Sequence, residues 1–304
     1  MQEKSRILQM DERLTLEHFL RQFIYTEEEI AASISLLVRF QKSEESYNEF
    51  MKYYNSYKNF HVINYKELYE KIEALAKESY MEPYELQLLF IQMLAAHSEH
   101  FYKAKGYSHA LWIDCLTDLV WKMRECKRVN GFYGSRTFTW FERWLYATRI
   151  TLGRLQFEII ESGSDYKSDR FDIKVGDKLI NVHIPEDSTK AFSEENCKKA
   201  FSMAREFFRD DLGDKVIFRC SSWLLFPKHN EILPETSNIR RFLNSFEIDK
   251  NSVTLSNSNL WRIFYTDKSI DFLHEYPENS SLQRAYKQFL SSGESSGGAT
   301  GYKY

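Results

Sequence analysis

The stretch FDIKVGDKLINVHIPEDSTKAFSEENCKKAFSMAREFFRDDLGDKVIFRCSSW, residues 171–223, contains the elements that decide the fold. Residues 171–175 and 178–184 alternate apolar and polar side chains around a Gly-Asp turn signal, so they are predicted to form a β-hairpin. Ser193 fits the N-cap of a helix, and residues 216–223 fit a further strand. In this order the helix can join two parallel strands as a right-handed crossover, with residues 179–184 central in a mixed sheet.

The loop that enters this helix, residues 186–192, is a natural place for a ligand. The first N–H groups of a helix have no partner inside the helix and point out of its start. In sheets of this kind, ligands bind at the carboxyl ends of the strands. We therefore expect a pocket between the two parallel strands that favours an anion, lined by His183 and Cys220 and open toward residues 188–193.

The composition excludes several classes of protein. The chain has 304 residues, enough for two domains, and 16% of them are aromatic, which argues against a disordered chain. A formal net charge of -3 gives no basic surface for nucleic acid or anionic lipid. No apolar run approaches the roughly 20 residues of a membrane span. Residues 1–13 are charged and lack an apolar segment, so we expect no signal peptide and a cytoplasmic protein. The oligomeric state is left open.

Histidines and cysteines raise the question of a metal. His97, His100 and His109 are close in sequence but lack the spacing and the neighbouring glutamate of a helical zinc motif. They fit solvated or capping histidines near a helix end. The four cysteines show no C-x-x-C spacing and fit reduced, buried thiols. The sequence therefore predicts no metal site.

The first half of the chain contains almost no glycine or proline, which predicts an all-helical domain over residues 1–136. Residues 111–129 are expected to form one long helix. Asp118 and Lys122 are spaced on it for an ion pair, which we favour over a binding role.

From residue 137 on, the apolar pattern changes to the alternation of strands. Residues 153–160 and 260–265 are predicted strands, and residues 291–304 are either mobile or a final extended segment. The aromatic stretch 140–148 is expected to be helical and buried. The sequence thus predicts an α+β chain, with an all-helical N-terminal domain followed by a mixed α/β domain over residues 137–304.

Several stretches carry a resemblance to a known family. They are LGRLQFE (152–158), HIPE (183–186), CSSWLLFP (220–227), SNI (237–239) and LQR (282–284), together with Asp118, Lys122, Glu125 and GFYG (131–134) in the first half. They are similar to a family of bacterial acyltransferases that join a helical N-acyltransferase N-terminal domain to a GNAT-like C-terminal domain. The resemblance implies transfer of an acyl group from a CoA-type thioester, acyl-CoA or acetyl-CoA, to an amine acceptor. The alternative is a degenerate, non-catalytic fold that binds a ligand or a protein partner.

One stretch departs from the pattern of GNAT domains. Their pyrophosphate loop carries glycines, which let backbone N–H groups close on the phosphates. Residues 186–192 (EDSTKAF) contain none, and the two acidic residues would repel a phosphate. Ser188, Thr189 and Lys190 could still contact one. The loop therefore favours the non-catalytic alternative. The polar residues His183, Glu158, Gln156 and Arg154 favour the enzyme, and we prefer the enzyme.

Acyl transfer to an amine needs a base, an acid for the leaving thiolate, and donors at the carbonyl oxygen. His183, near the end of the central strand, is the expected base, and Glu158 is a second candidate. A structural histidine and an Arg154–Glu158 ion pair are the competing interpretations of these residues. By the resemblance, Tyr265 would be the acid, because a strand tyrosine often serves so in this fold.

The predicted binding residues surround these catalytic groups. They are Arg154, Gln156, Ser188, Thr189, Lys190, Ser193, Cys220 and Ser222. Among them, Cys220 is expected to be a buried small side chain, because a nucleophilic cysteine needs an activating neighbour.

Overall fold

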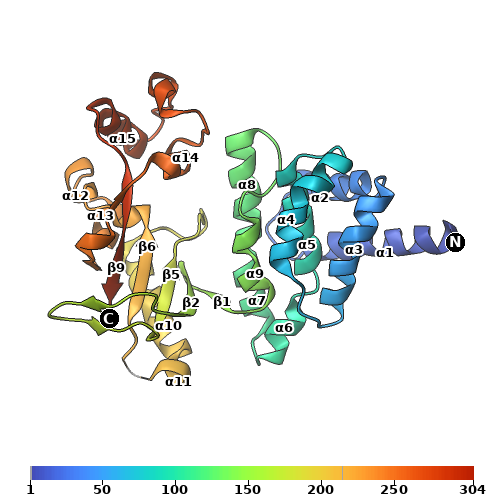
Figure 1. Cartoon of the computed structure of the whole chain (residues 1–304), viewed down its shortest axis with the longest axis horizontal. Helices are drawn as coiled ribbons and strands as arrows, with labels where there is room; N and C mark the ends of the chain where they lie inside the picture. The colour runs from blue at the N-terminus through green and yellow to red at the C-terminus, as the bar shows by residue number, and fades with distance from the viewer. Residues whose placement is uncertain (1, 214) are drawn as a thin grey trace. The chain divides into compact units, whose positions relative to one another are not determined.

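The computed structural model describes residues 2–213 and 215–304, with side chains from residue 11 onward. The expected absence of a signal peptide rests in part on side chains outside this description. The chain divides into two compact units, Met1–Ile150 and Thr151–Tyr304 (Figure 1). This division lies later than the boundary expected at residue 136, because the residues after it pack on the first unit. The ring of Phe138 stacks on Tyr65 at 4.5 Å, and the hydroxyl of Tyr57 donates to the carbonyl of Leu145 at 2.5 Å.

Unit 1 is helical, as predicted. Its helices are α1 Gln2–Leu20, α2 Glu27–Phe40, α3 Glu44–Lys58, α4 Tyr65–Glu78, α5 Pro83–Ala95, α6 Glu99–Ala104, α7 His109–Leu116, α8 Asp118–Asn130, η1 Phe138–Trp140 and α9 Glu142–Leu145. Helix α5 is the core of the unit, since residues 86–95 are all buried and it packs against α1, α2, α3, α4 and α8. The expected burial of the aromatic stretch that begins at Trp140 is confirmed for Phe141, Trp144 and Leu145, whereas Trp140 is half-buried.

The long helix predicted over residues 111–129 is interrupted at one residue, Thr117, which lies between α7 and α8 and keeps helical dihedral angles. The Thr117 hydroxyl donates to the carbonyl of Ile113 at 2.8 Å, a bond that bends helices. Lys122, on α8, pairs with Glu125 at 3.3 Å, and both side chains are buried.

Unit 2 is built on a seven-stranded sheet with the order β1-β2-β5-β6-β9-β7, and β8 pairs with β9 beside it. The strands are β1 Arg149–Leu152, β2 Leu155–Glu161, β3 Tyr166–Lys167, β4 Asp172–Ile173, β5 Lys178–His183, β6 Phe218–Ser222, β7 Glu247–Ile248, β8 Thr254–Leu255 and β9 Gly297–Lys303. The helices are α10 Glu194–Phe207, α11 Arg209–Leu212, η2 Trp223–Leu225, α12 His229–Ile232, α13 Asn238–Leu243, η3 Lys250–Ser252, η4 Asn257–Asn259, α14 Trp261–Phe264, η5 Ile270–Glu275 and α15 Ser281–Ser291. β5 and β6 are parallel and joined through α10, which confirms the predicted crossover.

The hairpin predicted between residues 171–175 and 178–184 is wrong. The turn exists, with Gly176 at φ 89°, but β5 pairs antiparallel with β2 over six residue pairs. β4 pairs instead with β3, in a separate two-stranded ribbon. The longer ladder with β2 outweighs the local one, because each further pair adds backbone hydrogen bonds and side-chain contacts.

The strand predicted over residues 260–265 is also wrong, because these residues form α14. Leu260, Ile263 and Phe264 have helical spacing, and all three are buried in one cluster with α15. Tyr265 is the C-cap of α14 in the left-handed region at φ 52°. The tail after residue 291 is extended, and β9 lies inside the sheet between β6 and β7.

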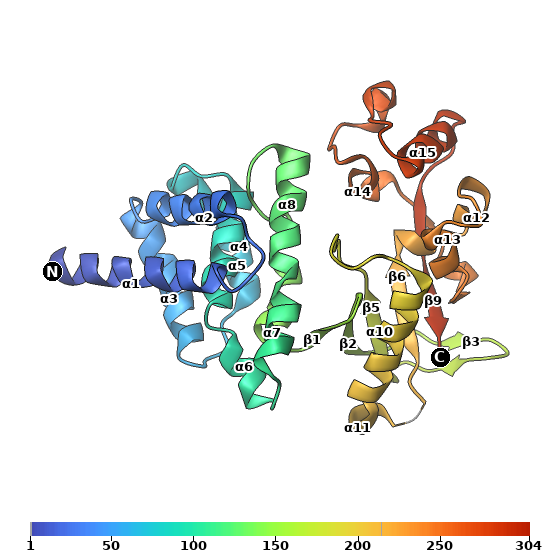
Figure 2. The same cartoon turned by 180° about the vertical axis from the view of Figure 1, so that it is seen from behind.

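One face of the sheet is apolar and is covered by α10, which lies in front of the sheet in Figure 2 and behind it in Figure 1. We call it the apolar face. Phe157 of β2, Phe218 of β6 and Phe201 of α10 form a triangle of ring contacts with centroids 4.9–6.0 Å apart. Gly153 lies in the turn between β1 and β2 at φ 64°, a left-handed conformation that favours glycine.

No helix in residues 2–213 and 215–304 combines the length and the apolar composition that crossing a membrane requires.

Candidate active site

The opposite face of the sheet carries polar side chains at its centre. Because side chains alternate along a strand, the partners of Phe157 and Phe218 on the other face are their sequence neighbours. In the register of the sheet Gln156 lies opposite His183, Glu158 opposite Asn181, and Asn181 opposite Arg219. We call this set, on strands β2, β5 and β6, the polar face.

His183 and Glu158 form a hydrogen-bonded pair in this set. The His183 Nε2 lies 2.7 Å from the Glu158 Oε1, with 12% of the histidine and 4% of the glutamate side chain exposed. An ionised carboxylate only accepts hydrogen bonds, so the proton between them belongs to Nε2. The lone pair of the neutral ring is then on Nδ1, which is the arrangement of a general base held by a carboxylate.

Asn181 connects this pair to Arg219. The Arg219 guanidinium donates to the Asn181 Oδ1 at 3.2 Å. The Asn181 Nδ2 lies 3.2 Å from the Glu158 Oε1 and 2.9 Å from the His183 Nε2. Sequence reasoning missed both residues, although Asn181 stands two positions before His183 and so shares its face of the strand.

The parallel strands part beside His183. In the described residues the β5–β6 ladder has two pairs, Ile180 with Phe218 and Asn181 with Arg219. β5 continues to His183, whereas β6 continues on β9, where Ser222 faces Ala299. His183 therefore lies two residues beyond Asn181, the last residue of β5 that pairs with β6.

In the loop before α10, a side chain of the loop accepts a hydrogen bond from one of the loop's own backbone N–H groups. The Asp187 carboxylate accepts from the Thr189 N–H at 2.7 Å and from the Thr189 hydroxyl at 2.6 Å. Ser188 and Thr189 are exposed and Lys190 is half-buried. Ser193 caps α10 as predicted, accepting from the Asn196 N–H at 3.2 Å. The Asp187 carboxylate thus takes a place at an N–H that a glycine loop would offer to a phosphate.

A hollow of about 460 Å³ opens at the start of α10. It is lined by Ser193, Glu194, Glu195, Lys198, Asn238 and Arg241. A narrower pocket of about 40 Å³ shares several of these residues and includes Lys303. Burial, followed by the charges of Arg205 and Lys198, lowers the pKa of Lys303. We call Lys198, Arg241 and Lys303 the cation cluster, which sequence reasoning missed because its members come from α10, α13 and β9.

Three predicted residues lie away from His183. Cys220 shares the alternation of Phe218 and so belongs to the apolar face, which means that His183 and Cys220 do not line one pocket. Its thiol is fully buried, and burial raises its pKa to about 12. The Ser222 hydroxyl accepts from the Leu224 N–H and caps η2. Tyr265 is on no strand, so the argument that made it the acid no longer holds.

Arg154, in the turn before β2, and Gln156, on β2, flank the site. Arg154 is buried beneath the loop before α10, where it donates to the carbonyl of Pro185 at 2.8 Å and lies over the Phe192 ring at 5.3 Å. Arg154 therefore holds both ends of this loop, through Pro185 before it and Phe192 at its end. Gln156 is 2% exposed and stands opposite His183 on the polar face.

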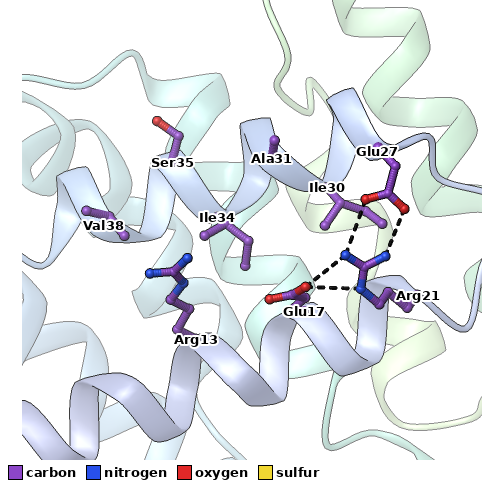
Figure 3. A pocket seen from close by; sticks show the side chains of 9 residues that line it. All are labelled: Arg13, Glu17, Arg21, Glu27, Ile30, Ala31, Ile34, Ser35 and Val38. Atoms are coloured by element: carbon purple, nitrogen blue, oxygen red, sulfur yellow. Dashed lines mark hydrogen bonds and ion pairs between the residues drawn. The ribbon is translucent and has the colours of Figure 1, made fainter.

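A metal site and the groove in unit 1 are two further possibilities for a functional site. Across the described ranges, no group of three or more His, Cys, Asp and Glu side chains could hold a metal ion. The groove of about 400 Å³ between α1 and α2 is crossed by Arg21, which pairs with Glu17 and Glu27 (Figure 3). None of the predicted site residues lines it.

Both halves of the chain match known protein domains. Residues 15–147 match the N-acyltransferase N-terminal domain, and residues 150–303 match the GNAT-like C-terminal domain. A search of curated proteins found no match.

Four structures are similar to this chain. One, an acyltransferase in complex with decanoyl-CoA and teicoplanin, has a TM-score of 0.62 and 23% identity over 77% of this chain and 68% of that one. An acyltransferase mutant in complex with octanoyl-CoA has a TM-score of 0.63 and 22% identity over the same shares, 77% and 68%. At these identities the likeness establishes the fold. The two family matches together span nearly the whole chain, so it belongs to the family of acyltransferases that join an N-acyltransferase N-terminal domain to a GNAT-like C-terminal domain.

Proposed function

We propose that this chain transfers an acyl group from an acyl-CoA to a small-molecule amine, with His183 as the general base. The observation that carries the proposal is the 2.7 Å hydrogen bond between His183 and Glu158, at the point where β5 and β6 part. A carboxylate beside a histidine stabilises the imidazolium that forms when the ring takes a proton.

The chemistry follows from this pair. The amine nitrogen attacks the thioester carbonyl carbon, and its proton passes to the His183 Nδ1 as the C–N bond forms. Glu158 stabilises the resulting imidazolium through Nε2. The tetrahedral intermediate then breaks its C–S bond, and the proton moves from Nδ1 to the leaving thiolate. The products are an amide and free CoA, and no separate acid such as Tyr265 is required.

The cation cluster is the proposed site for the phosphates of the donor. Similar structures hold decanoyl-CoA, octanoyl-CoA or CoA, and their fold is that of this chain. Arg241 is exposed and Lys198 is paired with Glu194 at 2.6 Å. A phosphate in the hollow would offset the charges that lower the pKa of Lys303. In this chain, side chains would thus replace the glycine-rich backbone that binds phosphates in other GNAT domains. This replacement answers the argument that favoured a non-catalytic fold.

The acceptor is proposed to be a small molecule with an amine. One similar structure was determined with both decanoyl-CoA and teicoplanin, which shows that its fold accommodates a small molecule beside an acyl-CoA. The polar face supports an amine acceptor here, because a base is needed to remove its proton.

Substitution of His183 tests the proposal. Thiol release from acyl-CoAs of different chain length would be measured with a panel of primary amines. His183→Ala should lower kcat by about 10²- to 10⁴-fold and leave the KM for acyl-CoA nearly unchanged, because a base acts in the transition state. His274→Ala, at an exposed histidine of the same unit, is the matched control and should keep full turnover. Unchanged kcat in His183→Ala would exclude His183 as the base.

The donor site has its own test. The double variant Lys198→Ala, Arg241→Ala should raise the Kd for acyl-CoA by about tenfold at low salt, and by less at high salt, because exposed charges are screened. Lys250→Ala, at an exposed lysine of η3, is the control. Calorimetry measures both. Equal affinity in the double variant and the native chain would place the phosphates elsewhere, and binding of no acyl-CoA by the native chain would favour the non-catalytic alternative.

A further inference from the structure

The chain of hydrogen bonds behind His183 ends at a cation. It runs from the Arg219 guanidinium to the Asn181 Oδ1, and from the Asn181 Nδ2 to the Glu158 Oε1. Each of the three strands β6, β5 and β2 contributes one member. The strand register places these residues directly opposite one another, so the chain is built into the sheet and does not depend on a loop.

Arg219 fixes the orientation of the Asn181 amide. A guanidinium has only donors, so the atom of Asn181 that it contacts must be the carbonyl oxygen. The amide nitrogen then faces the Glu158 Oε1 at 3.2 Å and the His183 Nε2 at 2.9 Å. Because the Nε2 proton is directed at the carboxylate 2.7 Å away, the amide donates to Oε1 and only lies beside the ring nitrogen. An asparagine without this partner could turn its oxygen toward the carboxylate, which would repel it.

The position of the Asn181 nitrogen determines what the carboxylate can do. The Glu158 Oε1 accepts from both the His183 Nε2 at 2.7 Å and the Asn181 Nδ2 at 3.2 Å. Two donors on one oxygen keep that oxygen at the histidine and favour the ionised carboxylate. The ionised carboxylate in turn keeps the proton on Nε2. The Nε2–H tautomer places the lone pair on Nδ1, where the proposed reaction needs it.

We infer that Asn181 and Arg219 are positioning residues, which hold Glu158 so that the His183 proton stays on Nε2 and Nδ1 acts as the base. This inference rests on the proposed function for its effect on turnover. Its effect on the tautomer of His183 is a property of the protein without substrates.

The tautomer is the first measurement. Long-range ¹H–¹⁵N spectra of the full chain, labelled at histidine, distinguish a ring protonated on Nε2 from one protonated on Nδ1. The native chain should show His183 as the Nε2–H form, and Asn181→Leu should show a mixture with a substantial Nδ1–H fraction. A purely structural role for Asn181 would not move this signal. If Asn181→Leu fails to fold, Asn181→Ala removes the donor to Glu158 without adding bulk or charge, and it should give the same mixture.

Turnover is the second measurement. Asn181→Leu should lower kcat by about 10- to 100-fold, the effect of one hydrogen bond to a charged group, with less than a threefold change in the KM for acyl-CoA. Arg219→Met should lower kcat in the same direction, and Arg219→Lys, which retains a cationic donor, should recover part of the loss. In the Asn181→Leu background, Arg219→Met should cost less than a further twofold, because its effect passes through Asn181.

Ser221→Ala is the matched control. The Ser221 hydroxyl accepts from the Thr300 hydroxyl at 3.1 Å, a hydrogen bond between neighbouring strands on the same face of the sheet. Its loss should leave both the tautomer and kcat unchanged within twofold. An unchanged tautomer in both Asn181 variants, or fully additive effects of Asn181→Leu and Arg219→Met, would overturn the inference. A His183→Ala variant with full turnover would overturn the proposed function, and the tautomer measurement would still decide the role of Asn181.

Discussion

The same strands present two different surfaces. On the apolar face, Phe157 and Phe218 pack with Phe201 of α10. On the polar face, one residue away along each strand, Glu158 and Arg219 belong to a chain of hydrogen bonds that ends at the candidate base. The comparison shows that neighbouring residues of one strand can belong to different faces of the sheet, one packed in the core and the other in the candidate active site. We expect the apolar face to determine stability and the polar face to determine turnover.

Phe157→Ala should cause the largest loss of stability. Phe157 is fully buried, and its removal leaves a cavity beside the rings of Phe201 and Phe218. The free energy of unfolding should fall by about 3–5 kcal/mol. Urea denaturation followed by circular dichroism measures the fall, and kcat per folded molecule should stay within twofold. A large specific loss of kcat would break the separation between the two faces.

Glu158→Gln should lower kcat strongly and change stability little, the reverse of Phe157→Ala. The amide keeps the volume of the side chain but loses the charge that stabilises an imidazolium, so kcat should fall by about 100-fold. Stability should change by less than about 1 kcal/mol, since the amide oxygen can still accept from Nε2. Steady-state kinetics and urea denaturation on the same samples check this. Equal losses in both quantities would mean that Glu158 is structural.

A second buried histidine sharpens the comparison. His229 is fully buried, bonds the carbonyl of Leu224 through Nδ1 at 3.2 Å, and bonds the Tyr286 hydroxyl through Nε2. It has no carboxylate beside it among these partners, and burial lowers its pKa to about 4.

The unfolded chain, where a histidine has a pKa near 6.5, therefore binds more protons than the fold between about pH 6.5 and pH 4. The free energy of unfolding should fall as pH falls through this window, by about 1–2 kcal/mol from this group between pH 7 and pH 5. His229→Gln should flatten the pH dependence measured by urea denaturation. His97, whose pKa burial also lowers to about 4, contributes in the same direction and remains in the variant. An unchanged slope would show that His229 is not buried as a neutral ring.

Cys220→Ala should have the smallest effect. The thiol lies on the apolar face and its pKa is raised to about 12, so it is neither placed nor ionised for attack on a thioester. We expect kcat within twofold of the native value and a stability loss of about 1 kcal/mol. Mass spectrometry after incubation with acyl-CoA should find no acyl group on the protein. An acyl-cysteine at Cys220, with loss of turnover in the variant, would replace direct transfer by a covalent mechanism.

Sequence reasoning was most successful where the contacts are local. The Ser193 cap of α10 could be predicted, because a cap depends on residues three positions apart. The partner of β5 could not, because the choice between β4 and β2 is decided by ladder length across the sheet. Tyr265 was assigned to a strand from alternation, although the helical spacing of Leu260, Ile263 and Phe264 was present in the same residues.

For the candidate site, strand alternation placed His183 and Glu158 on polar positions, but it could not show which strands are neighbours. Asn181 and Arg219 become part of the site only when β5 lies between β2 and β6. The cation cluster could not be predicted from the sequence for the same reason, since Lys198 and Lys303 are brought together by tertiary packing.

The position of β9 has a consequence for how the protein is made. β6 ends at Ser222, and the strand that completes its other edge begins at Gly297. At 5–20 residues per second, a ribosome needs roughly 4–15 s to add the residues between them. During this interval the nascent β6 presents an open edge, and neither β7 nor β8 can close it, because both pair with β9. Open edges recruit strands from other chains. The yield of correctly folded protein should therefore depend on the time between the synthesis of β6 and that of β9, and on the chaperones that cover the edge of β6 during this time.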